Sequence, residues 1–260
     1  MEAVKEFFGF GGYNRPVEGF LSWQHILFVS VFFAIMLFLA FYIGKKNKKK
    51  DEASKNKVLV WTAIIINVVE IIRIIILCFR VNELTPFLYN FPLYLCSIQF
   101  ITIPLAAFTK GRVKEASLDF VLIFGILGSI MGTYFAGNNY GSYPVLCFDN
   151  FFLNTTHCMS GFAAFYIVIT NMESMKKKNL WISFSILGVF GVLAYISNIA
   201  LGANYMFLMG GDGTPYDLVY YLLNGHKVFY PLSVMLLFVL YILVFYWVYY
   251  LIKNKKKKAN

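Results

Sequence analysis

Cys96 and Gln99 have types and a spacing that suggest chemistry in an otherwise apolar stretch. Pro92 suits the first turn of a helix. Cys96 then lies about one turn inside, where the positive end of the helix dipole favours a thiolate. Gln99 follows at i+3 on the same face. Buried cysteines are usually inert small hydrophobic residues, so a packing role for Cys96 is the alternative.

His157 is the second chemical candidate, and it lies in a different apolar stretch. Counted at ~1.5 Å per residue, it is ~9 Å from the beginning of that stretch, with Asn154 one turn earlier. An intramembrane histidine is a functional candidate by default, because polar groups in hydrocarbon are costly and imidazole titrates near neutral pH. A hydrogen-bonded core histidine is the alternative.

A third group is charged. Asn67, Glu70 and Arg73 follow one another in three-residue steps and therefore share one stripe of a helix. Glu70 and Arg73 can pair locally, which lowers the cost of burying each charge. The group is either a structural clamp between helices or the charged wall of a substrate pocket.

Further polar residues lie toward the end of the sixth apolar stretch and after it. Asn198 lies near the end of that stretch, and Asn204 and Tyr205 lie early in a long connection that is rich in glycine. Long connections on one face of a rigid scaffold often carry function. His226 precedes the last stretch, where we expect an ordinary solvated loop residue.

Seven apolar stretches must position these side chains. The chain has 260 residues, of which 59% are hydrophobic and 14% charged, whereas soluble domains are about 45–50% apolar and about 25% charged. Each stretch is near the ~20 residues that cross ~30 Å of hydrocarbon. We therefore predict an all-α, polytopic membrane helical bundle of about seven transmembrane helices. The stretches are 25–43, 58–79, 92–108, 118–135, 151–170, 180–201 and 228–252.

The third stretch is the shortest, and Pro104 lies inside it. Proline removes a helical hydrogen bond and bends or breaks a helix. We therefore expect a kink or a re-entrant segment between residues 92 and 108.

The basic residues predict the orientation of the bundle. Eighteen of the 23 Lys and Arg follow the first, third, fifth and seventh stretches. With an odd number of spans these segments share one side, which the positive-inside rule makes cytoplasmic. We expect an extracytoplasmic segment 1–24, a transmembrane bundle 25–252 and a basic cytoplasmic tail 253–260, in a multi-pass protein of the plasma membrane.

With this orientation, the polar residues of four helices fall in one layer near the outer surface, and the inner halves of these helices are nearly free of such groups. A shared layer predicts a polar cavity that opens outward. Its expected substrate-binding residues are Asn67, Glu70, Arg73, Gln99, Asn154, Asn198, Asn204 and Tyr205.

Other patterns mainly exclude functions. The cysteines show no CxxC and no paired zinc spacing, and P-loop, Rossmann, HExxH and GxSxG motifs are missing, so we predict no metal and no cofactor. The net charge of +10 comes from lysine runs between apolar segments, which favours membrane lipids over nucleic acid as partners. Gly128 and Gly132 form a GxxxG pair, which packs helices closely within the chain or in an oligomer.

Three elements resemble the YwaF-type bacterial integral membrane proteins, and the resemblance covers nearly the whole chain. They are Phe91-Pro-Leu-Tyr-Leu-Cys-Ser, the histidine of the fifth stretch, and Gly202-Ala-Asn-Tyr-Met-Phe-Leu. That family resembles a eukaryotic multi-span acyltransferase that remodels phospholipids. It is more distantly similar to membrane hydrolases that cleave fatty-acid esters with a Thr/His pair.

The resemblance implies that Cys96 is a nucleophile and His157 its base. A thiolate attacks an acyl ester to give a thioester, and an imidazole takes and returns the proton. Asn154, Gln99 or Asn198 would then donate hydrogen bonds to the oxyanion. One departure is Tyr94, where the family often has a histidine.

Two functions from other classes remain as alternatives. A non-catalytic carrier or ligand-binding component would use the same outward cavity and the Glu70/Arg73 pair. A scaffold would pack against a partner through its GxxxG face.

Overall fold

The computed structural model describes residues 2–259, with side chains up to residue 255, and divides into two compact units, 1–174 and 175–260. The first residue of the predicted segment 1–24 and the end of the predicted tail 253–260 lie outside this description. Within the described residues the regular structure is entirely helical, and six helices are long and apolar enough to cross a membrane. The prediction of an all-α polytopic bundle is confirmed, and the number of seven spans is close.

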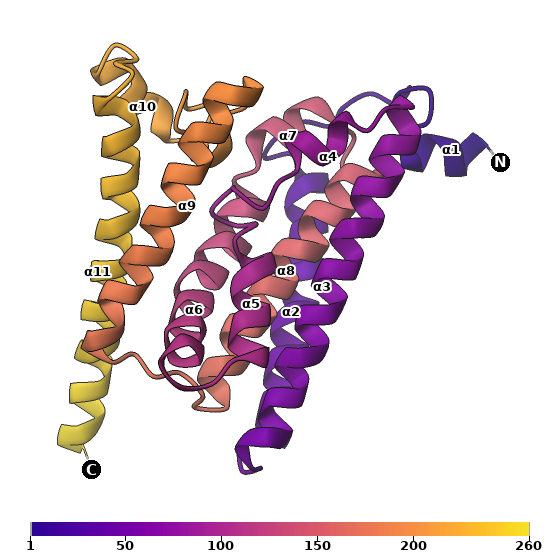
Figure 1. Ribbon diagram of the computed structural model, residues 1–260. Helices are drawn as coiled ribbons and strands as arrows, with labels where there is room; N and C mark the ends of the chain where they lie inside the picture. Colours follow the sequence, from indigo (N-terminus) through magenta and orange to yellow (C-terminus); the bar gives the residue numbers. More distant parts are fainter. Residues whose placement is uncertain (1, 260) are drawn as a thin grey trace. The chain divides into compact units, whose positions relative to one another are not determined.

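The first unit is a bundle around α8 (Phe148–Ile169), which packs against α2 (Trp23–Asn47), α3 (Glu52–Val81) and α6 (Gly111–Tyr134). The short apolar helix α5 (Gln99–Phe108) packs against α3 and α6. In Figure 1, the α2–α3 and α5–α6 connections lie at one end of this unit, and the short helices lie at the other. These short helices are α1 (Glu2–Phe8), α4 (Thr85–Tyr89) and α7 (Gly137–Ser142).

Capping residues explain where α3 begins and ends. The side chain of Asp51 accepts a hydrogen bond from the backbone N–H of Ser54 at 3.1 Å, which satisfies a donor that the first helical turn leaves free. At the other end Asn82 adopts a left-handed conformation (φ 55°) and closes the helix. Lys55 sits inside the first turn and pairs with Glu52 at 2.8 Å. The helix therefore extends into the basic connection, six residues earlier than the predicted stretch.

Helix α5 explains the short third stretch. The predicted stretch begins at residue 92, but the helix begins at Gln99, and residues 90–98 form turns. The Ser97 hydroxyl accepts from the backbone N–H of Tyr94 and donates to the carbonyl of Tyr94, both at 3.0 Å. Such local bonds compete with helix formation. Ten helical residues reach only about 15 Å, half of the hydrocarbon core. Because the helix begins at Gln99, the assignment of Pro92 to the first helical turn was wrong.

The N-terminal segment is fastened to the ends of α3 and α8. Arg80 and Asp149 form a two-pronged ion pair, with N–O distances of 2.7 and 2.9 Å. The Tyr13 hydroxyl donates to the same carboxylate. Within the segment, the backbone N–H of Arg15 donates to Glu6 at 3.1 Å and holds the pKa of that carboxyl below its usual value. No local sequence pattern indicates these contacts, because their partners are 69 and 136 residues apart.

The second unit contains α9 (Leu180–Leu201), α10 (Tyr216–Leu222) and α11 (Phe229–Ala259), with two single turns of 3₁₀ helix at Lys177–Asn179 and Tyr205–Phe207. Gly202 ends α9 in a left-handed conformation (φ 63°). At Gly191 a side chain would overlap the thioether of Met235, so this glycine lets α9 and α11 approach closely.

Large apolar side chains cover the outer faces of the long helices. Trp23, Phe79 and Trp181 are each more than 70% exposed. Contiguous exposed apolar surface of this kind is unsuited to water and matches lipid. The polar groups lie instead between the helices, where the candidate site is found.

Candidate active site

Cys96 and His157 meet inside the first unit. Their side chains lie close enough to act electrostatically on each other. A carbon added at Gly128 would lie 3.7 Å from the Cys96 Cβ and 4.0 Å from the ring of His157. The two candidates therefore border the same point on α6. They are 61 residues apart in sequence and lie on different elements.

The backbone fixes the orientation of the His157 ring. Its Nδ1 lies 2.8 Å from the carbonyl oxygen of Leu153, one turn earlier in α8. A carbonyl accepts only, so Nδ1 carries the proton, and in the neutral ring the lone pair is on Nε2. A base with this tautomer accepts a proton through Nε2, at the edge of the ring away from Leu153.

Cys96 lies in the turn that precedes α5, three residues before its first helical residue. The backbone N–H groups of Cys96 and Ser97 act electrostatically on its sulfur. The residue is partly exposed, whereas Cys147 and Cys158 are buried. A partly exposed thiol beside N–H donors and an imidazole is in the kind of environment in which cysteines are reactive.

Small residues on α6 and α8 make room for the pair. At Gly132 an added carbon would overlap the ring of His157, and at Gly125 it would lie 2.7 Å from the carbonyl oxygen of Ser160. At Gly161 it would lie 2.6 Å from Ser129. Gly132 thus serves close packing within the chain, the first of the two uses expected from the GxxxG motif. An oligomer through Gly128 and Gly132 stays a prediction.

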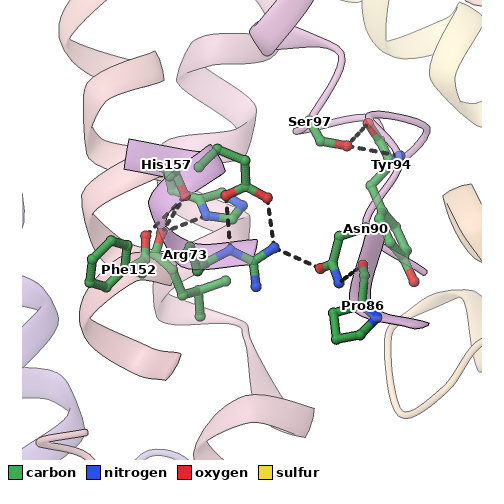
Figure 2. Close-up of polar contacts among 10 residues, drawn as sticks. Arg73, Pro86, Asn90, Tyr94, Ser97, Phe152 and His157 are labelled. Atoms are coloured by element: carbon green, nitrogen blue, oxygen red, sulfur yellow. Dashed lines mark hydrogen bonds and ion pairs between the residues drawn. The ribbon is translucent and has the colours of Figure 1, made fainter. Parts of the chain in front are cut away.

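The charged group of α3 is organised around Arg73. Its guanidinium donates to both oxygens of Glu70, at 2.8 and 2.6 Å, and to the amide oxygen of Asn90 at 2.6 Å. Figure 2 shows Arg73 bonded to Asn90, which in turn donates to the carbonyl oxygen of Pro86 on α4. The charge of Glu70 acts on the His157 ring. The expected pairing is present, and Asn90 is a partner that the sequence did not suggest.

The ion pair between Arg80 and Asp149 explains why these groups lie at the same level. It joins the last turn of α3 to the first turn of α8. Arg73 lies about 10 Å back along α3 from Arg80, and His157 lies about 12 Å along α8 from Asp149. Because Arg80 and Asp149 are joined and the two distances along the helices are similar, the charged group lies at the depth of the histidine.

Asn67 has a structural partner on α5. Its amide nitrogen donates to the carbonyl oxygen of Phe100 at 3.1 Å and to that of Ala63 at 2.9 Å. In a regular helix the carbonyl of Phe100 would accept from residue 104, but Pro104 has no N–H. Asn67 therefore satisfies the carbonyl that the proline leaves free.

We expect Asn67→Leu to lower the free energy of unfolding by about 1–3 kcal/mol, because it leaves the Phe100 carbonyl unpaired. Pro104→Ala restores an N–H that can bond to this carbonyl. Asn67→Leu should therefore cost less in the Pro104→Ala background, and unfolding in detergent can measure this non-additivity. Equal costs in both backgrounds would contradict the assigned role.

Asn154 belongs to a buried cluster near the beginning of α8. Its amide donates to the Tyr140 hydroxyl and, at 2.6 Å, to the carbonyl of Asn150. The ring of His25 stacks 3.7 Å from Tyr140, and its Nε2 lies 3.3 Å from the carbonyl of Thr133. His25 is fully buried, but its place at the beginning of an apolar stretch gave no reason to single it out.

Asn198, Asn204 and Tyr205 lie in the second unit and hold its long connection together. Asn198 bonds to the backbone N–H of Tyr205 at 2.6 Å and to its carbonyl at 3.1 Å. Asn204 donates to Asp212 at 2.7 Å and to Gly210 at 2.8 Å. A role for these residues at the Cys96 site stays a prediction. His226 accepts from backbone N–H groups at the beginning of α11.

Two surface hollows are found elsewhere in the first unit. One, of about 780 Å³, is lined by α1 and Ile76 of α3. The other, of about 680 Å³, is lined by residues between 83 and 88. Neither includes Cys96 or His157 in its lining, so the outward polar cavity stays a prediction.

The family of the chain follows from its similarity to known proteins. Residues 20–251 match the sequence model of the TMEM164 family. The chain belongs to the TMEM164 family. The match includes every residue of the candidate site, and it agrees with a multi-pass membrane protein. Searches of curated proteins and of solved structures gave no match.

Proposed function

We propose that this TMEM164-family chain is a membrane-embedded acyltransferase or esterase with Cys96 as nucleophile and His157 as base. The proximity of these two side chains, which both border Gly128, carries the proposal. The resemblance to YwaF-type proteins and to a phospholipid-remodelling acyltransferase supports it. The site would work on lipid esters in the plasma membrane, beside an outward polar cavity.

The proposed reaction begins when Nε2 of His157 takes the thiol proton of Cys96. The sulfur then attacks the ester carbonyl, and the proton passes from His157 to the departing alcohol, which leaves a thioester on Cys96. An acceptor alcohol or water attacks the thioester, with His157 again taking the proton. Tyr94 contributes its backbone to the Ser97 turn, a contribution that does not depend on the side chain at this position.

The test is acylation of the purified protein in detergent by 4-nitrophenyl octanoate, an activated ester. We expect a burst of nitrophenolate and an octanoyl group on Cys96, detected by mass spectrometry of peptides. Cys96→Ala should abolish both signals, and His157→Ala should slow acylation about 100-fold or more. Unchanged acylation in both variants would remove the assignment.

Matched controls are available within the chain. Cys78 is also partly exposed, and His226 caps α11 by accepting from Val228 and Phe229. Cys78→Ala and His226→Ala should acylate at the rate of the unaltered protein. A similar loss in these controls would show a general sensitivity to substitution rather than a Cys96–His157 pair.

A second function is favoured by a different observation. The Glu70–Arg73–Asn90 group is only partly exposed, and the charge of Glu70 acts on His157, as in a binding site for a polar ligand or headgroup. A ligand-binding component or carrier would keep its binding of phospholipid in Cys96→Ala and lose it when Arg73 is replaced. Catalysis by Cys96 predicts that turnover, rather than binding, is lost in Cys96→Ala.

A further inference from the structure

Gln99 is a buried polar residue with no role in the proposed reaction steps. Its side chain is fully buried, and its amide nitrogen has no hydrogen-bond partner. The amide oxygen accepts from the Thr102 hydroxyl at 3.1 Å. A buried amide donor without a partner is costly and uncommon in proteins, and such a group often serves a ligand.

The backbone places Gln99 at the nucleophile. Its N–H donates to the carbonyl oxygen of Cys96 at 3.3 Å, which closes the turn that carries the thiol and begins α5. The N–H groups of Cys96 and Ser97 act electrostatically on the sulfur. An amide side chain and the nucleophile's own N–H form the oxyanion hole in other acyl-transfer enzymes.

The other two amides suggested by the sequence are already occupied. The nitrogen of Asn154 donates to Tyr140 and to the carbonyl of Asn150. Both polar atoms of Asn198 bond to the backbone of Tyr205. Of the three candidates, Gln99 alone has a buried amide nitrogen with no acceptor among the described residues.

We infer that Gln99 is a catalytic residue that donates a hydrogen bond, with the backbone N–H groups of Cys96 and Ser97, to the oxyanion formed when Cys96 attacks an acyl ester. The inference rests on the proposed function. When the C–S bond forms, the carbonyl π electrons move to the oxygen, and the donors stabilise this charge. When the oxyanion collapses, the bond to the leaving alcohol breaks, and that alcohol takes the proton held by His157.

The test compares two reactions of the same thiol in Gln99→Leu. Acylation by 4-nitrophenyl octanoate passes through an oxyanion, whereas alkylation by iodoacetamide does not. We expect the acylation rate constant of Cys96 to fall about 100-fold, while the alkylation rate changes less than about twofold. Gln99→Met keeps a similar side-chain length but lacks the donor, and it should be equally slow in acylation.

Controls separate this inference from a structural effect and from the proposed function. Thr102→Val removes the hydroxyl that bonds to the Gln99 amide oxygen but keeps the amide donor, so acylation should fall less than in Gln99→Leu. If Gln99→Leu slows alkylation as much as acylation, or slows neither, the oxyanion role is overturned. If the unaltered protein is not acylated at Cys96, the proposed function itself fails.

Discussion

Gly132→Ala is expected to abolish acylation of Cys96 and to lower the free energy of unfolding by about 1–3 kcal/mol. An added methyl group would overlap the His157 ring, and overpacking of this kind costs that much in tightly packed cores. The ring is held at Nδ1 by Leu153, so it cannot move away and keep both this bond and its contact with Cys96. Acylation by 4-nitrophenyl octanoate and unfolding in detergent measure the two effects.

Gly128→Ala is the matched control from the same motif. Its methyl group would lie 3.7 Å from Cys96 and 4.0 Å from His157, which are ordinary contacts. Alanine also favours a helix over glycine by about 1 kcal/mol. We therefore expect unchanged or slightly higher stability and near-normal acylation. If instead both variants change only the oligomeric state, the glycines form an interface between subunits.

Arg73→Met is expected to lower the free energy of unfolding by about 3 kcal/mol. The side chain of Glu70 is only 12% exposed, and removal of one partner leaves a nearly buried charge uncompensated. The Asn90 amide oxygen also loses its donor. Unfolding in detergent or mixed micelles measures the loss.

The double variant Glu70→Gln/Arg73→Met removes both charges together. Because no buried charge is then left alone, we expect it to be more stable than Arg73→Met. Its acylation and phospholipid binding can then be measured on a folded protein. Normal acylation and normal phospholipid binding would support a structural clamp between helices. A selective loss of binding would support the charged wall of a substrate pocket. A double variant less stable than Arg73→Met would contradict the pairing argument.

Most of the fold could be predicted because lipid imposes a strong pattern on sequence. Six apolar stretches became long helices, and the third, which is the shortest and contains Pro104, became the short helix α5. The beginning of α5 could not be predicted, because the Ser97 turn competes with a helix that Pro92 and the apolar residues favour equally. The orientation predicted from the lysines depends on the membrane and stays a prediction.

The site was predictable in residue types but not in geometry. Cys96, His157, Glu70 and Arg73 stood out because polar groups are rare in apolar sequence. Their approach depends on the packing of α6 against α8 at Gly132 and on the α3–α8 contact at Arg80. These are contacts between distant residues, which no local pattern encodes.

The brevity of α5 has a consequence for synthesis of the protein. Lipid cannot satisfy the exposed backbone of the turn at residues 90–98, so this segment is stable at membrane depth only among protein partners. Those partners include α6 and α8, which leave the ribosome after α5. The segment that carries Cys96 therefore lacks some of these partners until α8 has entered the membrane. Because His157 lies on α8, the thiol meets its histidine only in the last stage of assembly of the first unit.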